Sequence, residues 1–270
     1  MPELPEVETV ARSLRRRLTG KKILDICNEW PKHLATHDLD TMRQRISGTA
    51  INGIDRRGKY IVFTLDSCDS LIIHLKMTGQ LLIQPTSMPV PDHVHTVFLL
   101  SGSEELRFRD VRKFGRVYLA ANSDDVLGKL GPEPLSESFT PALLYMMLAK
   151  RRRIMKPLLL DQEFIAGIGN IYADESLFMA RLAPKRTSNT ISRSESDLLH
   201  WSIQLTLQSA IENGGVTIND YRQPDGSEGE MQNSLRVYGR EGEPCFRCAG
   251  VVDRIVLGSR STYFCPSCQV

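Results

Sequence analysis

Apolar residues recur at helical spacing near the start of the chain, at Val7, Val10, Ala11, Leu14 and Leu18. Glutamates fall in the first turn of this pattern and arginines 15–17 fall at its end, as the helix dipole favours. Pro5 suits the first helical turn, because the N–H that proline lacks would have no partner there. The pattern predicts a helix from Pro5 to about Gly20, and it leaves Pro2 and Glu3 in front of the helix without a structural reason.

Between residues 22 and 121 the pattern changes to short runs in which apolar and polar residues alternate. Examples are TAINGIDRRGKYIVFTLD and SLIIHLKMTGQLLI, which are rich in β-branched and aromatic residues. Alternation of this kind is typical of strands with one buried face. We expect an antiparallel two-layer β-sandwich with the N-terminal helix packed on it.

Residues 122–140 are rich in proline, glycine, serine and acidic residues, which predicts a linker. Helical patterns follow. Residues 140–162 predict a helix, a basic break and a second short helix, and residues 170–182 and 192–215 predict one helix each, with Ser192 or Ser194 as the N-cap of the last and longest. Residues 216–244 are polar with little periodicity, and loops of that length are commonly lids or disordered. The fold class is therefore α+β and multi-domain, with a mainly helical second domain.

Composition adds limits on the function. The chain has 270 residues, enough for two domains, and 41% of them are hydrophobic. Its 34 basic and 32 acidic residues give a net charge of +2, so attraction to nucleic acid has to come from local clusters of charge. The sequence has no bilayer-spanning apolar run and no signal-peptide core, which predicts a soluble, cytoplasmic protein.

Four of the six cysteines form two C-x-x-C pairs: Cys245, Cys248, Cys265 and Cys268. Two turns that each deliver two thiolates make the tetrahedral site of a structural zinc ion, and disulfides are the alternative. The alternating segment between the pairs predicts a β-hairpin with Arg260 near its tip, where a solvated arginine is the ordinary interpretation. Cys27 and Cys68 lie in apolar stretches, where we expect buried free thiols.

A glycine turn and a basic run lie close together in the helical region. The turn AGIGNIYADE lacks the third glycine and the βαβ unit of a dinucleotide site, so we reject that interpretation. It leads instead into a helix whose first residue, Asn170, and nearby amides are suited to hold a phosphate. The basic run upstream consists of Lys150, Arg151, Arg152, Arg153 and Lys156. Runs of charge are usually solvated, but this pairing favours a surface for a nucleic-acid backbone.

Two further motifs, HLKMTGQ and DVRKFGRV, place a large side chain beside a glycine in a turn between strands. Met77 and Phe114 are ordinarily core residues in such motifs, and Arg112 a surface charge. If the three project from loops instead, they form a wedge that enters a base stack and fills the place of an extruded base. The sequence leaves both possibilities open.

The chain resembles the formamidopyrimidine-DNA glycosylase family across essentially its whole length, in PELPEVET, RGKY, HLKMTGQ, FRDVRKFG, LGPEPL, KPLLLDQ, GIGNIYADESLF, VYGREGEPC and the paired cysteines. The resemblance implies a catalytic β-sandwich domain in 1–121, a helix-two-turn-helix domain in 141–235 and a zinc finger in 236–270 with one structural Zn²⁺. It implies a monomeric repair enzyme that binds double-stranded DNA between its domains. Such an enzyme removes oxidised purines, such as 8-oxoguanine and formamidopyrimidines, and then cuts the strand at the abasic site.

The resemblance also gives Pro2 and Glu3 a role. Once Met1 is removed, Pro2 carries a terminal secondary amine, and terminal amines titrate near ~8, so a useful fraction is a free nucleophile at neutral pH. Attack on C1′ of the damaged nucleotide expels the base and gives an iminium, from which β- and δ-elimination follow. Glu3 is expected to transfer protons and Glu6 to orient the amine and the sugar.

Further residues match the family by motif. Lys59 in RGKY and Arg260 in the hairpin match residues that bind phosphate and assist β- and δ-elimination respectively. The expected DNA contacts are His74, His93, Arg112, Arg152, Lys156 and Asn170. The expected base-gap-filling residues are Met77, Arg112 and Phe114. Residues 216–235 correspond to the loop that covers the damaged base, where Asn219 stands in place of the lysine that some relatives carry.

Two other functions remain open. Endonuclease VIII-like enzymes, which act on oxidised pyrimidines, typically begin Pro-Glu-Gly-Pro-Glu, whereas this chain reads Pro-Glu-Leu-Pro-Glu after Met1. A non-catalytic zinc-ribbon protein that only binds DNA would need neither Pro2 nor Glu3. The start of the chain therefore favours the enzyme for oxidised purines.

Overall fold

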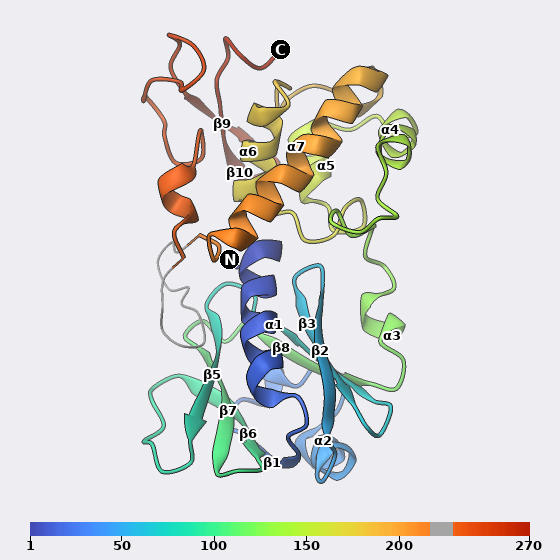
Figure 1. The fold of residues 1–270 in the computed structure, drawn as a ribbon, viewed down its shortest axis with the longest axis vertical. Helices are drawn as coiled ribbons and strands as arrows, with labels where there is room; N and C mark the ends of the chain where they lie inside the picture. The colour runs from blue at the N-terminus through green and yellow to red at the C-terminus, as the bar shows by residue number, and fades with distance from the viewer. Residues whose placement is uncertain (217–228) are drawn as a thin grey trace. The chain divides into compact units, whose positions relative to one another are not determined.

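The computed structural model describes residues 1–216 and 229–270. The chain divides into two compact units, Met1–Lys129 with Gly214–Glu230 and Leu130–Asn213 with Met231–Val270 (Figure 1). The boundary between Lys129 and Leu130 lies inside the linker expected at 122–140. The helices that follow the linker and the zinc-finger segment belong to the second unit.

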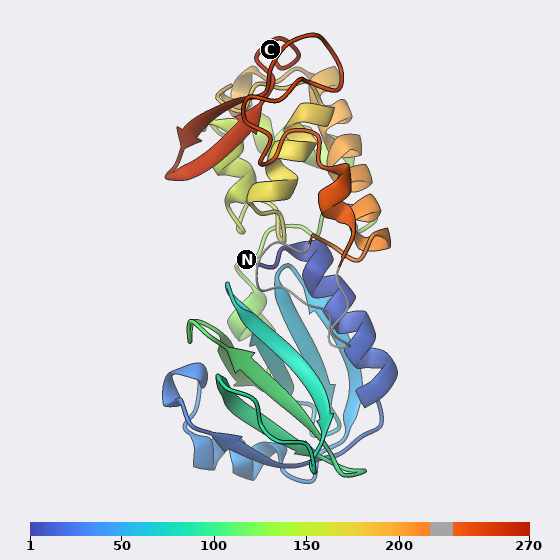
Figure 2. The ribbon, with the colours of Figure 1, turned by 90° about the vertical axis from the view of Figure 1, so that its left-hand side faces the viewer.

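The first unit is a sandwich of two four-stranded antiparallel sheets, as the alternation predicts (Figure 2). One sheet, ordered β1-β6-β7-β5, consists of β1 (Ile23–Asn28), β6 (Val94–Leu100), β7 (Glu104–Asp110) and β5 (Gly79–Pro85). The other, ordered β2-β3-β4-β8, consists of β2 (Ile51–Arg57), β3 (Tyr60–Leu65), β4 (Ser70–His74) and β8 (Arg116–Ala120). Apolar side chains from both sheets form one core between the layers.

Helix α1 (Leu4–Leu18) contributes its apolar face to this core. Glu3 is its N-cap and Pro5 lies in its first turn, so Glu3 has a structural role that the sequence pattern did not indicate. The unit also contains η1 (Pro31–His33), α2 (Leu39–Ile46) and α3 (Asp124–Leu127). Cys27 on β1 and Cys68 in a turn are free thiols, as predicted, but the prediction that they are buried is wrong, because both are exposed.

The second unit is mainly helical, as predicted. Its helices are α4 (Pro141–Ala149), α5 (Met155–Leu160), α6 (Asn170–Met179) and α7 (Arg193–Glu212), with short turns η2 (Ser188–Thr190) and η3 (Met231–Ser234). Ser192, rather than Ser194, is the N-cap of α7 and forms a capping box with Glu195. Strands β9 (Asp253–Leu257) and β10 (Arg260–Phe264) pair as the expected hairpin. No helix in the described ranges is long and apolar enough to cross a membrane.

Helix α6 holds the C-terminal segment in this unit. The buried Glu175 carboxylate accepts the backbone N–H groups of residues 236, 237 and 238, each at 2.9 Å. Asp174, its neighbour, accepts a backbone N–H of β10 at 3.1 Å. Near the end of the helix, Arg247 donates to the carbonyl of Phe178 at 2.8 Å and lies 4.4 Å from the centre of its ring. The zinc-finger segment is thus attached along the length of α6.

Candidate active site and nucleic-acid interface

The start of α1 brings together Pro2, Glu3 and Glu6. All three are buried, whereas Met1 is 55% exposed. Glu6 Oε2 accepts the N–H of Glu3 at 2.8 Å, and Glu6 Oε1 accepts the N–H of Val216 at 2.8 Å. A carboxylate held by two backbone N–H groups has a fixed position, because such charge-assisted bonds are strong. Glu6 therefore fixes the backbone immediately after Pro2.

A second cluster lies where strands of the second sheet end. Lys59, 5% exposed, lies in the turn between β2 and β3, and His74, 7% exposed, ends β4. Burial, together with Lys76 and Lys59, lowers the pKa of His74 to about 3. Its Nδ1 accepts the N–H of Lys76 at 2.9 Å. The ring is therefore neutral at physiological pH and carries its proton on Nε2, where it can donate to a phosphate oxygen.

The structure decides between the two interpretations of Met77, Arg112 and Phe114. All three project from loops, with Met77 42% exposed and Phe114 46% exposed. Arg112 Nη1 lies 3.1 Å from the sulfur of Met77, and the Arg112 guanidinium lies 4.9 Å from the centre of the Phe114 ring. The core interpretation is wrong, and the two loops together present one exposed cluster of two apolar side chains and a cation.

The two histidines at the start of β6 differ in exposure. His93 is exposed and adopts a positive φ of 68°, and its carbonyl accepts the N–H of Asp110 at 2.8 Å. His95 is half-buried, and its ring meets the ring of His33 edge-on at 5.6 Å. Burial, with His33 and Lys113 nearby, lowers the pKa of His95. Of the two rings, that of His93 is the one open to a ligand.

In the second unit, Asn170 begins α6 as the glycine turn predicts. Its Nδ2 donates to the carbonyl of Ser261 at 3.1 Å, so the hairpin of β9 and β10 is bonded to the start of this helix. Arg260, which precedes Ser261, is exposed. Arg152 is exposed in the segment before α5. The structure therefore places Ser261, the neighbour of Arg260, against Asn170 at the N-terminus of α6. The N-terminus of a helix favours the binding of an anion.

Lys156 differs from the expectation that it contacts DNA. Its side chain is fully buried, and its ammonium lies 2.7 Å from Asp174 Oδ1 and donates to the carbonyl of Asn170 at 2.7 Å. A buried, paired ammonium is not available to a phosphate at the surface. Lys156 instead supports α6, and the exposed members of the basic run are Lys150, Arg152 and Arg153.

The four cysteines of the C-x-x-C pairs converge as predicted, with their sulfur atoms within 4.8 Å of one another. Cys245 and Cys268 are 3.8 Å apart at sulfur, and Cys248 and Cys265 are 3.7 Å apart. These distances exclude disulfides, and they match the edge of roughly 3.8 Å that a tetrahedron with Zn–S bonds of about 2.3 Å requires. The donor set therefore fits one structural Zn²⁺.

Comparison with known proteins agrees with this geometry. The model of the formamidopyrimidine-DNA glycosylase N-terminal domain matches residues 1–117, that of the H2TH domain of the same enzyme matches 130–222, and that of a zinc finger found in FPG and IleRS matches 242–270. A formamidopyrimidine-DNA glycosylase of Desulfitobacterium hafniense is 43% identical over 274 residues, which cover 100% of both chains. The chain belongs to the formamidopyrimidine-DNA glycosylase family. A relative of that name from Chloroflexus aurantiacus is 45% identical and covers 100% of this chain and 98% of its own.

Solved structures of formamidopyrimidine-DNA glycosylases have the same fold. A complex of the LlFpg protein with a THF-DNA and an inhibitor is 40% identical, with a TM-score of 0.92 over 100% of both chains. A Lactococcus lactis Fpg mutant with a Fapy-dG-containing DNA is 40% identical, with a TM-score of 0.93 over 99% of each chain. MutM with a DNA that contains carbocyclic 8-oxo-G is 41% identical, with a TM-score of 0.91 over 99% of each chain.

For this glycosylase-family chain, sequence reasoning missed the polar residues beneath the exposed cluster, namely His33, Thr78 and Asp110. Asp110 lies inside the FRDVRKFG motif, so its position next to the turn was the available signal. His33 gave none, because it reaches Asp110 from a distant part of the chain. The predicted lesion-covering loop at 216–235 lies largely outside the described residues, Asn219 included.

Proposed function

We propose that this protein removes oxidised purines, 8-oxoguanine and formamidopyrimidines among them, from double-stranded DNA in the cytoplasm and then cleaves the strand at the abasic site. The observation that carries the proposal is the arrangement at the start of α1, where Pro2 is followed by two buried carboxylates, Glu3 and Glu6. A structural N-cap needs one acceptor side chain. It does not need a proline directly after the initiator methionine.

The reaction begins with the amine of Pro2 after loss of Met1. The lone pair of the amine attacks C1′ of the damaged nucleotide, and the bond from C1′ to the base breaks with protonation of the leaving base. The nitrogen of Pro2 then loses its proton, and the bond from C1′ to the ring oxygen breaks with protonation of that oxygen, which leaves an iminium between Pro2 and C1′. The iminium acidifies C2′, so loss of a proton there expels the 3′ phosphate, and a second elimination expels the 5′ phosphate. Hydrolysis of the iminium returns the free amine.

The remaining residues assist these steps. Glu3 is placed beside the amine to give a proton to the sugar ring oxygen and to take it back. Glu6, held by two N–H groups, positions the amine. Lys59 binds phosphate and assists β-elimination, and Arg260 binds phosphate and assists δ-elimination.

Recognition of DNA uses the exposed cluster and the neutral histidine. His74 donates from Nε2 to a phosphate, and His93, Arg152 and Asn170 supply further backbone contacts. Met77, Arg112 and Phe114 fill the gap that the extruded nucleotide leaves in the duplex. A zinc ion, when bound to the four cysteines, stabilises the hairpin that presents Arg260.

Borohydride trapping tests the proposal. Protein whose mass shows loss of Met1 is mixed with duplex that contains 8-oxoguanine opposite cytosine, and the expected result is a covalent adduct at Pro2. Pro2→Gly and Glu3→Gln should each slow excision by roughly 10²-fold or more. Glu8→Gln is the matched control, because Glu8 lies on the same helix and pairs with Arg12 and Arg56 at its flank.

Three outcomes would contradict the proposal. Absence of an adduct with zinc-loaded, processed protein would exclude Pro2 as the nucleophile. Faster excision of thymine glycol than of 8-oxoguanine would favour the endonuclease VIII-like alternative. Equal binding of damaged and undamaged duplex at matched salt, without excision, would favour a protein that only binds DNA.

A further inference from the structure

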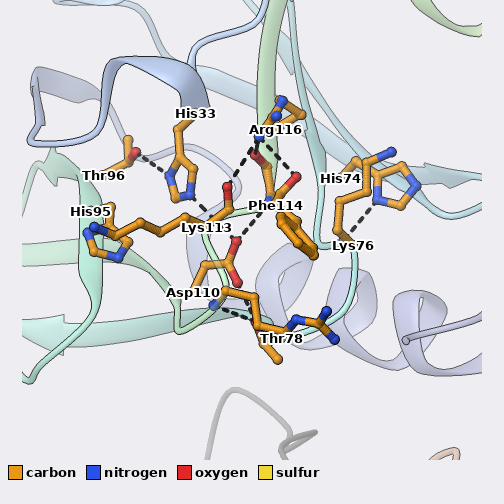
Figure 3. A network of polar contacts seen from close by, with 12 residues as sticks. His33, His74, Lys76, Thr78, His95, Thr96, Asp110, Lys113, Phe114 and Arg116 are labelled. Carbon is orange, nitrogen blue, oxygen red and sulfur yellow. Dashed lines mark hydrogen bonds and ion pairs between the residues drawn. The ribbon is translucent and has the colours of Figure 1, made fainter.

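One buried carboxylate connects the two loops that carry the exposed cluster. Asp110 ends β7 and is 0% exposed. Its Oδ1 accepts the hydroxyl of Thr78 in the first loop, and its Oδ2 accepts the N–H of Gly115 in the second loop at 2.6 Å (Figure 3). The Thr78 oxygen in turn accepts the N–H of Arg112 at 3.1 Å. The Thr78 hydroxyl therefore bonds both Asp110 and the backbone that carries the Arg112 side chain.

Steric contacts with one ring fix the ends of the same loops. A Cβ at Gly115 would lie 2.3 Å from Cζ of Phe108, and a Cβ at Gly79 would lie 2.8 Å from Cε2 of that ring. Both glycines thus closely approach the ring of Phe108, which is itself fully buried on β7. The loops after β4 and β7 are consequently both positioned by contacts with β7.

Two further groups stabilise this arrangement. His33 stacks on Phe108 with ring centres 4.8 Å apart, and its Nε2 lies 3.6 Å from Asp110 Oδ2. Arg116 Nη1 donates to the carbonyls of Gly115 and Phe114, at 2.7 and 3.0 Å. Asp110 and Thr78 bond each other through their side chains, and the further bonds of Asp110, Thr78 and Arg116 end on the loop backbone at Gly115, Arg112 and Phe114. None of them uses the exposed side chain of Met77 or Phe114.

We propose that Asp110, through Thr78 and Gly115, is a positioning residue that holds Met77, Arg112 and Phe114 as one preassembled wedge for base extrusion. The inference rests on the proposed function, in which these three side chains fill the gap in the duplex. A wedge whose parts are already aligned enters the stack without first ordering two loops, and a displacement of about 1 Å in such a group can cost up to ~10²-fold in rate. Asp110 itself does not touch DNA in this scheme.

The test separates base extrusion from chemistry. Thr78→Val keeps the shape of the side chain and removes both hydroxyl bonds. It should slow single-turnover excision of 8-oxoguanine from duplex by about tenfold or more, while cleavage of an abasic site in single-stranded DNA, which has no base to extrude and no gap to fill, stays within about threefold of wild type. Insertion of the wedge is followed independently by fluorescence of 2-aminopurine placed opposite the lesion.

Thr36→Val is the matched control. The Thr36 hydroxyl also donates once and accepts once, to the carbonyl and from the N–H of Leu119 in the same unit, away from both loops. Asp110→Asn should retain most of the excision rate, because the amide oxygen accepts from Gly115 and the amide N–H donates to Thr78. Asp110→Ala should lose most of the excision rate, because alanine makes neither bond. If that variant does not fold, Thr78→Val still tests the inference.

Failure of the proposed function would be seen in the wild-type protein, as the absence of a trapped adduct at Pro2. Failure of the present inference would be seen only in the variants. With an active wild type, excision by Thr78→Val at the rate of Thr36→Val would overturn the inference. So would a proportional loss of duplex excision and single-strand cleavage, since that pattern indicates general damage to the fold.

Discussion

Glu6 Oε1 accepts the N–H of Val216 at 2.8 Å, although the two residues are 210 positions apart in the chain. The other oxygen of the same carboxylate accepts the N–H of Glu3. The same carboxylate therefore holds the backbone of Val216 and the backbone of Glu3, which directly follows Pro2. Gly215 makes this approach possible, because a Cβ there would lie 2.8 Å from Glu6 Oε1.

The first prediction concerns Gly215→Ala. The new methyl group should push the Glu6 carboxylate away from Glu3, and we expect trapping at Pro2 to slow by about tenfold. Gly48→Ala is the control, because Gly48 has a similar φ of 82° with nothing within 4 Å of an added Cβ. Both variants strain the backbone by roughly 1–2 kcal/mol. Equal trapping rates in the two variants would show that the carboxylate position is unimportant.

The second prediction concerns the protonation of His74. Burial first, and then Lys76 and Lys59, lower the pKa of this ring to about 3. Because the folded pKa lies below the unfolded value of about 6.5, the stability contributed by the neutral ring is present above pH 6.5 and is lost as the pH falls toward 3. The Cε1–H resonance of His74, assigned with His74→Gln, should stay constant from pH 8 to pH 5. A titration midpoint of this resonance near pH 6 would contradict a His74 ring that is neutral at physiological pH.

The third prediction is an acid-dependent loss of stability at Asp110. Burial raises the pKa of this carboxyl, but the nearby His33 ring and the hydrogen bonds from Thr78 and Gly115 outweigh burial and lower it to about 2. A depressed folded pKa gives stability that is present above the unfolded value near 3.8 and is lost as the pH falls through 2. The difference corresponds to about 2 kcal/mol. Denaturant unfolding between pH 5 and pH 2.5 should show this slope in wild type, and Asp110→Asn should remove it.

The fourth prediction concerns the buried pair of Lys156 and Asp174. Burial raises the pKa of Asp174 to about 7 even beside the ammonium, so Lys156→Met leaves an acid without its partner. We expect a loss of about 3–5 kcal/mol in the free energy of unfolding at pH 7. Adding Asp174→Asn should restore part of it, because the amide oxygen can still accept the N–H of Tyr263. Lys150→Met, at an exposed position of the basic run, should change stability by less than about 0.5 kcal/mol. A similar loss in both lysine variants would refute the assignment.

These residues show what the sequence can and cannot predict. Helix α1, the alternating strands and the cysteine pairs follow from local spacing, because period and short ligand spacing are properties of neighbouring residues. The burial of Lys156 depends on its ion pair with Asp174. Lys156 lies on α5 and Asp174 on α6, so the pair forms only when these two helices pack together. Cys27 belongs to an apolar run, but its neighbour Ile26 takes the core face of β1. Asp110 acquires its partners from three separate segments.

The attachment of the C-terminal segment along α6 limits how such proteins can exchange parts. Glu175 serves the chain just before the cysteine pairs, Asp174 serves the hairpin between them, and Phe178 receives Arg247 from the first cysteine turn. In a chimera that takes residues 236–270 from a relative, the grafted backbone would still donate to Glu175 and Asp174, whereas the contact with Phe178 requires an arginine at position 247. Grafting is therefore expected to succeed when the host helix keeps carboxylates at positions 174 and 175, so α6 and the cysteine-rich segment together form the unit to match in recombination.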